Sequence, residues 1–301
     1  MFSTNNYSLP ESLLFLPTRL NRKKLENIVK NKTILITGAT FGIGEKLAYQ
    51  LANTGANLIL VARTEEKLNQ IKIEIEASGG KVEIFPTDLT QTESVEKLLN
   101  KLNNLPNGVD IVINNAGKSI LRSITDSLDR FHDFQRTMAL NYFAPVQLLL
   151  GLIPILERNK GHIINISAVN VLLIPAPFWS AYQSSKTAFD QWFRCAAPEL
   201  NAAGIKTTSI YLPLVRTRMI EPTAEYKNAP AMSPQHVASI ICKAIYTQTK
   251  YFSPWWLIFG QIASVLFRYP WEILMPRFIK SKKLSTKETR SSEKKVFTDN
   301  Q

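Results

Sequence analysis

Cysteine is scarce in this sequence of 301 residues. Cys195 and Cys242 are its only two cysteines, so at most one disulfide bridge can form. Both lie in helix-like segments, which favours reduced thiols in a cytoplasmic protein. This scarcity excludes a small domain that depends on several disulfides.

Long hydrophobic runs are missing as well. No segment has the roughly eighteen uninterrupted apolar residues typical of a membrane-spanning helix, so the sequence predicts no such helix. The apolar run at 13–16 is far too short for a secretory signal, and no basic residue precedes it. With 45% hydrophobic and 20% charged residues, the composition excludes a wholly disordered chain and a collagen.

Acidic residues are fewer than basic ones, 24 against 36, which gives a net charge of +12. Residues 1–32 hold six basic and two acidic residues, and residues 277–301 hold eight and three, so only +3 remains for the rest of the chain. A nucleic-acid-binding domain carries its basic face on the fold itself, so this distribution argues against a nucleic acid as partner. Basic ends suit an anionic membrane surface or a solubilising tail.

Short β-rich runs alternate with longer helical segments between residues 33 and 211. This alternation predicts right-handed crossovers and hence an α/β fold, a Rossmann-type doubly wound parallel sheet with helices on both faces. The predicted strands are Thr33–Thr37, Asn57–Val61, Lys81–Phe85, Val109–Ile113, His162–Ser167 and Lys206–Tyr211. The predicted helices are 43–53, 65–78, 91–103, 128–157, 181–203 and 234–248.

The sequence predicts a single domain with an extension at each end. Residues 1–30 form the N-terminal extension and residues 31–250 form the domain. Residues 251–279 form an apolar, aromatic and helical segment in which prolines recur. Residues 280–301 are basic and rich in serine, threonine and glutamate, and we expect them to be disordered.

A glycine-rich turn follows the first predicted strand and leads into a helix. Glycine permits a tight turn and a close approach of the backbone to a pyrophosphate, and the unpaired N–H groups at the helix start face that anion. The turn lies in a strand–turn–helix unit, so it predicts dinucleotide binding. The candidate cofactor-binding residues of this turn are Gly38, Thr40, Phe41, Gly42, Ile43 and Gly44.

The second predicted strand ends in Ala62 and Arg63. An enzyme that uses NAD places an acid here to bind the adenosine ribose, and Ala62 has no charge. Arg63 can pair with a 2′-phosphate, so the sequence favours NADP. Asp88, just past the third strand, either accepts a hydrogen bond from the adenine amine or caps the helix that begins near Thr90.

Tyr182 and Lys186 are four residues apart in a predicted helix, which places them on one face. Free tyrosine has a pKa of about 10, too high for easy proton exchange at neutral pH. We expect the ammonium of Lys186 to lower the pKa of Tyr182 toward the working pH. By itself such a pair is common on helix surfaces, so its meaning depends on the other motifs.

Together these motifs resemble the short-chain dehydrogenase/reductase family over about residues 30–250. The resemblance implies an NADP(H) cofactor, no metal ion, and oxidation or reduction of a carbonyl/alcohol pair. The motifs that carry it are, in chain order, Thr37–Gly44, Asp88, Asn114–Gly117, Asn141, Tyr182 with Lys186, and Pro213–Thr217.

The resemblance also implies roles for individual residues. Tyr182 would donate a proton to the substrate carbonyl, while Lys186 would bind the nicotinamide ribose and lower the pKa of Tyr182. Asn141 would hold a water molecule in a proton relay to Lys186, and Thr217 would lie near the nicotinamide carboxamide. The remaining cofactor-binding residues that the resemblance implies are Asn115, Ala116, Gly117, Pro213 and Val215.

One position departs from the family pattern. Relatives usually end the fifth strand with two serines, and the second binds the substrate oxygen. This chain has Ser167 and then Ala168, so alanine stands in the place of that serine. Three interpretations stay open: a bulge turns Ser167 inward, Ser119 substitutes for it, or the protein is a weak or inactive member. Ser167 is kept as a candidate catalytic residue beside Tyr182, Lys186 and Asn141.

Finer resemblance is to the reductase domains of bacterial fatty acyl-CoA reductases, in segments 115–120, 129–134, 140–143 and 213–217. It implies NADPH-dependent reduction of a carbonyl or acyl thioester of a lipid-like substrate, with fatty acyl-CoA favoured. The alternatives are a soluble reductase of ketoacyl, steroid or other small carbonyl substrates, and an NADP-binding scaffold or sensor. Arg216 and Arg218 are candidates for binding the CoA phosphates. His132 is predicted to lie on a helix surface.

Residues 255–267 form an apolar segment with two tryptophans at one end, too short to span a bilayer. Followed by a basic tail, it suits a helix lying in a membrane interface. It equally suits a helix that covers the substrate cleft or a dimer interface. The predicted location is the cytoplasm, either free or at the inner face of a membrane, and homo-oligomerisation stays open.

Overall fold

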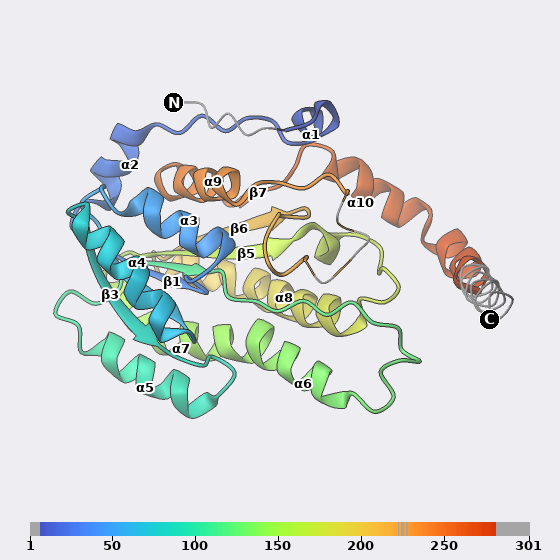
Figure 1. The fold of residues 1–301 in the computed structure, drawn as a ribbon, viewed down its shortest axis with the longest axis horizontal. Helices are drawn as coiled ribbons and strands as arrows, with labels where there is room; N and C mark the ends of the chain where they lie inside the picture. The colour runs from blue at the N-terminus through green and yellow to red at the C-terminus, as the bar shows by residue number, and fades with distance from the viewer. Residues whose placement is uncertain (1–6, 222, 224–225, 227, 281–301) are drawn as a thin grey trace, which may run out of the picture. The chain divides into compact units, whose positions relative to one another are not determined.

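The computed structural model describes residues 7–221, 223, 226 and 228–280 (Figure 1). The chain divides into two compact units, one of residues 1–171 with 175–255 and one of residues 172–174 with 256–301. The first unit holds the sheet and both of its hydrophobic cores. The disordered tail predicted at 280–301 lies, except for Lys280, outside the described residues.

Seven parallel strands form one sheet in the order β3-β2-β1-β4-β5-β6-β7. The chain starts in the middle at β1 and winds first to one edge and then to the other, which is the doubly wound topology. The predicted fold class is therefore confirmed. The strands are β1 Thr33–Thr37, β2 Asn57–Ala62, β3 Lys81–Pro86, β4 Ile111–Asn114, β5 His162–Ala168, β6 Lys206–Leu212 and β7 Tyr251–Phe252.

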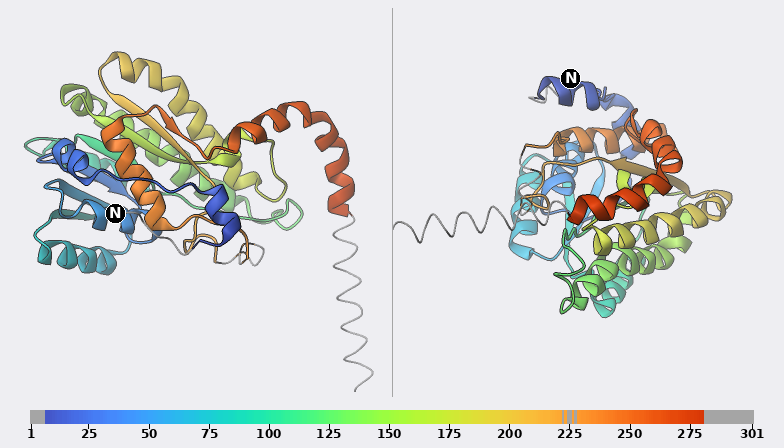
Figure 2. Two further views of the ribbon diagram at one scale, coloured as in Figure 1. Left: turned by 90° about the horizontal axis from the view of Figure 1, so that it is seen from above. Right: turned by 90° about the vertical axis from the view of Figure 1, so that its right-hand side faces the viewer.

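Helices cover both faces of the sheet, as Figure 1 and the two views of Figure 2 show. Side chains of a strand alternate between faces, so Ile34 and Ile36 of β1 join one core while Leu35 joins the other. The first core is completed by α2 Arg22–Val29, α3 Gly42–Leu51, α4 Glu65–Ala77 and α9 Pro234–Thr247. The second is completed by α5 Thr92–Asn103, α7 Ala144–Arg158 and α8 Ser180–Ala202.

The helix predicted at 128–157 begins later and is not regular. It comprises α6 Phe131–Met138, a π-helical turn η1 at Ala139–Phe143, and α7. The run Phe131–Arg158 is long and apolar enough to cross a membrane by length and composition alone, and 44% of its most apolar window is buried. A core helix of a globular protein passes the same test, and α7 packs its apolar residues into the second core.

The N-terminal extension contains two helices that the strand–helix pattern did not predict. They are α1 Leu9–Leu14 and α2, whose Leu25 and Val29 are buried in the first core. Glu11 of α1 is buried, accepts a hydrogen bond from the Ala231 main-chain N–H at 3.0 Å and pairs with Arg216. The extension is thus an integral part of the first unit.

Candidate active site

A cleft of about 640 Å³ opens at the carboxyl ends of the central strands. It lies where β1 and β4 adjoin and the winding of the sheet reverses direction, which is where open α/β sheets bind ligands. Its volume is within the range of small-molecule and cofactor sites. Its lining includes every cofactor-binding residue predicted from the sequence except Gly44, and also Tyr182, Lys186 and Ser167.

The glycine turn leaves no room for larger residues. Gly42 opens α3 with a φ of 60°, and a Cβ there would lie 2.8 Å from Thr217 Cγ2. The first-turn N–H groups of α3 have no partner within their own helix, which suits an anion. Gly44 does not line the cleft but packs behind the turn, since a Cβ on it would lie 2.3 Å from the Gly38 carbonyl oxygen.

Thr37 and Asn115 hold the glycine turn against the segment after β4. The Thr37 hydroxyl oxygen accepts hydrogen bonds at 3.0 Å from the main-chain N–H groups of Asn115 and Ala116. The Asn115 side-chain amide donates to the carbonyl oxygens of Thr37 and Gly38 at 2.9 and 3.1 Å. These bonds make one rigid floor from two separate motifs.

Arg63 and Asp88 lie at one end of the cleft, after β2 and β3. Arg63 is exposed and lines the cleft, so its guanidinium is accessible to a 2′-phosphate. Asp88 Oδ1 accepts hydrogen bonds from the Thr90 main-chain N–H at 3.0 Å and hydroxyl at 2.8 Å. Asp88 therefore bonds locally to Thr90 rather than capping α5, whose N-cap is Gln91, and it also faces the cleft.

The pKa of Tyr182 differs from the expectation. Burial, with a smaller effect of Tyr226, raises the pKa of Tyr182 to about 12, whereas we expected Lys186 to lower it. Desolvation disfavours the phenolate, and the Lys186 ammonium is directed elsewhere: it donates to the Ile166 carbonyl oxygen at 3.1 Å. The phenol consequently stays protonated, which is the form that can donate a proton.

Burial also lowers the pKa of Lys186, to about 8, against an opposing effect of Asp190. Lys186 and Asn141 meet at Gly117, where a Cβ would lie 3.4 Å from Lys186 Nζ and 3.4 Å from Asn141 Oδ1. Asn141 itself lies in the π-helical turn, accepts from the Lys118 main-chain N–H at 2.8 Å and donates to its carbonyl at 2.9 Å. Asn141 is thus fixed behind the cleft rather than in its lining.

The end of β5 shows where the unusual serine lies. β5 pairs with β6 without a bulge through Ser167 and Ala168, so the bulge that would turn Ser167 inward is not formed. Ser167 lines the cleft, but its hydroxyl lies 3.3 Å from Asp190 Oδ1 and donates to it. Ala168 and Ser119 also line the cleft, and Ser119 keeps a hydroxyl there.

Several cleft residues were missed by sequence reasoning because no motif marks them. Asn170 follows Ala168 by two residues and lines the cleft, and its buried Oδ1 has no hydrogen-bond partner in the part of the chain that the structure describes. The ring centroid of Trp179 lies 5.3 Å from that of Tyr182 and 5.9 Å from that of Tyr226. A tryptophan three residues before the tyrosine was the available signal, because that spacing places both rings on one helix face.

The two arginines proposed for CoA phosphates have different surroundings. Arg216 pairs with the buried Glu11 and does not line the cleft, so its charge is largely neutralised. Arg218 lines the cleft, and its guanidinium stacks 3.9 Å from the ring centroid of Phe41. His132 is half exposed at the helix surface and does not line the cleft, in agreement with the reading made from the sequence.

Comparison with known proteins identifies the family. The family model for short chain dehydrogenases matches residues 32–228. The chain belongs to the short-chain dehydrogenase family. Among curated relatives of this dehydrogenase, a fatty acyl-CoA reductase of Acinetobacter baylyi is 48% identical over 233 residues, 76% of this chain and 79% of that one.

Two further relatives of this short-chain dehydrogenase are informative. A fatty acyl-CoA reductase of Mycobacterium tuberculosis is 38% identical over 237 residues, 78% of this chain and 81% of that one. A solved metagenomic short-chain oxidoreductase in complex with NADP has a TM-score of 0.63 and 26% identity, and covers 74% of this chain and 93% of its own. The resemblance to this family and to its fatty acyl-CoA reductases is therefore confirmed.

Proposed function

We propose that this short-chain dehydrogenase uses NADPH to reduce a fatty acyl-CoA to a fatty aldehyde. The observation that carries the proposal is the position of Tyr182 and Lys186, which face the same cleft as the glycine turn and Arg63. The substrate class rests on the two reductases that are 48% and 38% identical to the chain.

The residues present fit a dinucleotide phosphate. Gly42 leaves a space that a Cβ would fill beside Thr217, at the start of α3, where a pyrophosphate is favoured. Arg63 would pair with the 2′-phosphate and Lys186 would reach the nicotinamide ribose. When bound, NADPH supplies the hydride that reduces the carbonyl carbon.

Tyr182 supplies the proton that this reduction needs. Its phenol donates to the carbonyl oxygen, so the thioester carbon becomes a hemithioacetal. Collapse of that species breaks the carbon–sulfur bond, releases the aldehyde, and leaves CoA thiolate to take up a proton. Lys186 would restore the phenol proton, because the residue lies one helical turn from Tyr182 and burial lowers its pKa to about 8.

Apolar and aromatic residues of the cleft lining would hold the acyl chain. Burying them against a chain of methylene groups excludes water from the reacting thioester. The lining residues of this kind include Val169, Trp179, Leu214, Met219, Ile220 and Tyr226.

The test follows NADPH absorbance with a panel of acyl-CoAs, fatty aldehydes and ketones. We expect turnover with long-chain acyl-CoA and a loss of at least about 10³-fold in Tyr182→Phe, with NADPH affinity retained. Turnover of small ketones or steroids alone would favour the alternative substrate class. If neither wild type nor Tyr182→Phe turned over any substrate while both still bound NADPH, the result would favour an NADP-binding scaffold or sensor.

The scaffold is the second candidate because of one observation. Ser167 is bonded to Asp190, and Ala168 has no hydroxyl, so the end of β5 offers the substrate oxygen no free donor. Loss of such a donor costs about 10²–10³ in rate. We favour the enzyme because a protein that only binds the cofactor has no need for the Tyr182 phenol at the cleft.

We also propose a cytoplasmic enzyme that contacts a membrane through α10 Leu257–Leu266. In the second unit, the Ile174 N–H donates to Ser264 Oγ at 2.9 Å, which ties residues 172–174 to one side of α10. Five apolar side chains of the helix are more than half exposed: Ile258, Phe259, Ile262, Val265 and Leu266. Basic residues follow at 268, 277 and 280, which suits an anionic interface.

Sedimentation with anionic liposomes tests this contact. The full chain should bind, and Ile262→Glu with Val265→Glu should abolish most binding, because both charges would have to enter the apolar layer. Ile73→Glu is the control, since Ile73 is an apolar residue on α4 whose exposure, 67%, lies between those of Ile262 and Val265. Equal binding by all three proteins would show that α10 has another role.

A further inference from the structure

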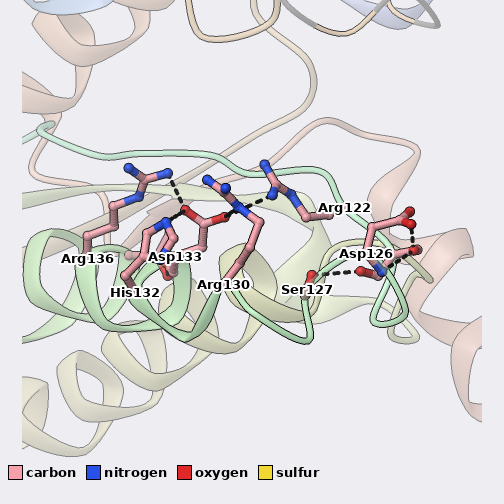
Figure 3. A network of polar contacts seen from close by, with 9 residues as sticks. Arg122, Asp126, Ser127, Arg130, His132, Asp133 and Arg136 are labelled. Atoms are coloured by element: carbon pink, nitrogen blue, oxygen red, sulfur yellow. Dashed lines mark hydrogen bonds and ion pairs between the residues drawn. The ribbon is translucent and has the colours of Figure 1, made fainter.

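Three arginines surround one buried carboxylate at the start of α6 (Figure 3). Asp133 is 2% exposed, and its oxygens lie 3.0 Å from Arg130 Nε and 3.5 Å from Arg122 Nη1. Arg136 also pairs with Asp133. Figure 3 shows the guanidinium groups in a row along one side of α6, with Asp133 among them. We call Arg122, Arg130 and Arg136 the arginine row.

The arginine row has more hydrogen-bonding capacity than Asp133 can use. Each guanidinium presents a fork of N–H donors, whereas the single carboxylate has two oxygens for all three. Arg136 Nε is buried and has no hydrogen-bond partner among the described residues. The side chains of Arg122, Arg130 and Arg136 are 32%, 34% and 41% exposed. An anion could therefore bind without displacing Asp133.

The row continues toward the cleft through Lys118. The pKa of Lys118 is lowered by burial and by the nearby positive charges of Arg136 and Arg63. Its neighbours Gly117 and Ser119 both line the cleft, and Asn141 holds its main chain in place. Lys118 thus adds a positive charge that is near both Arg63, at the proposed 2′-phosphate site, and Arg136 of the arginine row.

Acidic residues in the same segment do not cancel this charge. Asp126 is engaged by the Ser123 hydroxyl and lies at the far end of the network (Figure 3). Asp129 is exposed to solvent, where its charge is screened. Asp133 is the carboxylate within the row, and its pKa is lowered by the arginines despite its burial, so it stays ionised.

We propose that the arginine row binds the phosphates of the CoA moiety of the substrate. Arginine forks match phosphate oxygens in pairs, and CoA carries a diphosphate and a 3′-phosphate. The Arg122 main-chain N–H donates to the Phe178 carbonyl oxygen at 2.8 Å, next to Trp179 of the cleft lining, so CoA held at the row would have its thioester at the cleft. This inference rests on the proposed function. It assigns the CoA phosphates to the arginine row instead of Arg216, whose charge is neutralised by Glu11.

The test compares Arg122→Gln and Arg136→Gln with wild type, each saturated with NADP⁺ and titrated calorimetrically with CoA. Asp133 keeps two arginine partners in either variant. Arg158→Gln is the control, because Arg158 is exposed at the opposite end of the same helical run, about 30 Å from Arg136 at 1.5 Å per residue. Acyl-CoA and acyl-N-acetylcysteamine, which has the thioester but no phosphate, serve as substrates.

We expect about a tenfold rise in the CoA dissociation constant in each row variant and none in Arg158→Gln. KM should rise for acyl-CoA but not for the phosphate-free thioester, and added salt should weaken CoA binding to the wild type. If one row variant unfolds, the other row variant and the salt dependence of CoA binding to the wild type still test the inference.

Unchanged CoA affinity in both row variants would overturn the inference and leave the network a structural one. Weakened NADPH binding with intact CoA binding would overturn it too, since the phosphates recognised would then be those of the cofactor. Wild-type turnover of both thioesters with equal KM would also overturn it while sustaining the reductase. Turnover of neither would count against the proposed function itself.

Discussion

The Lys186 ammonium lies 3.1 Å from the carbonyl oxygen of Ile166, a residue near the end of β5. Lys186 is 8% exposed, so this bond replaces little of the hydration that the charged group loses on folding. The result is the lowered pKa of about 8. The enzyme therefore keeps the Lys186 ammonium at the proposed active site although its burial is unfavourable.

The first prediction concerns how Lys186 makes the stability of the protein depend on pH. The pKa of Lys186 is about 8 in the folded protein and 10.5 in the unfolded chain. Its contribution to the free energy of unfolding is therefore complete above pH 10.5 and is lost as the pH falls through 8. The unfolding free energy of wild type, relative to Lys186→Met, should rise by about 3 kcal/mol between pH 8 and 10.5. Urea denaturation measures it, and a flat difference would contradict it.

A second prediction concerns the missing serine. Ala168→Ser would add a hydroxyl to the cleft, at the position where the family resemblance implies a substrate-binding serine. We expect kcat to rise by about tenfold or more, because a new donor stabilises the developing oxyanion. Steady-state kinetics with a saturating thioester test this, with Ala168→Val as a size control. An unchanged or lower kcat in Ala168→Ser would mean that another group already fills the role.

The third prediction concerns the glycine turn. Gly42→Ala should raise the NADPH dissociation constant by about tenfold or more, because a Cβ would press on Thr217 at 2.8 Å and distort the start of α3. Gly79→Ala is the matched control: its φ is also positive, at 85°, but a Cβ there meets nothing within 4 Å. Both variants should lose about 1 kcal/mol of stability. Equal NADPH affinities would contradict the role of the turn.

The fourth prediction concerns acid. Burial, then the charge of Lys206, lowers the pKa of His162 to about 4, and its Nε2 lies 2.8 Å from the Thr208 hydroxyl. The folded protein favours the neutral imidazole. The free energy of unfolding should therefore fall by about 3 kcal/mol as the pH falls from 6.5 toward 4. His162→Gln should reduce this loss in chemical denaturation. A parallel loss in both proteins would place the acid-sensitive group elsewhere.

The longer strands were predictable because a strand covered on both faces must be apolar along its whole length. β1 and β5 follow this rule closely, as their side chains are buried almost throughout. β7 was missed because two residues, Tyr251 and Phe252, are too few to form a pattern. The buried position of Glu11 was also beyond reach, since its partners Arg216 and Ala231 are more than two hundred residues away.

By itself the sequence predicted the parallel sheet, because strand periodicity is a local property, and its ordered motifs carried the resemblance that implied the family and most of the cofactor-cleft residues. Tertiary structure alone decided the electrostatics. It placed the Lys186 ammonium on Ile166, the Ser167 hydroxyl on Asp190 and three arginines around Asp133. A pKa depends on burial and on charges brought together from distant parts of the chain, and residue spacing specifies neither.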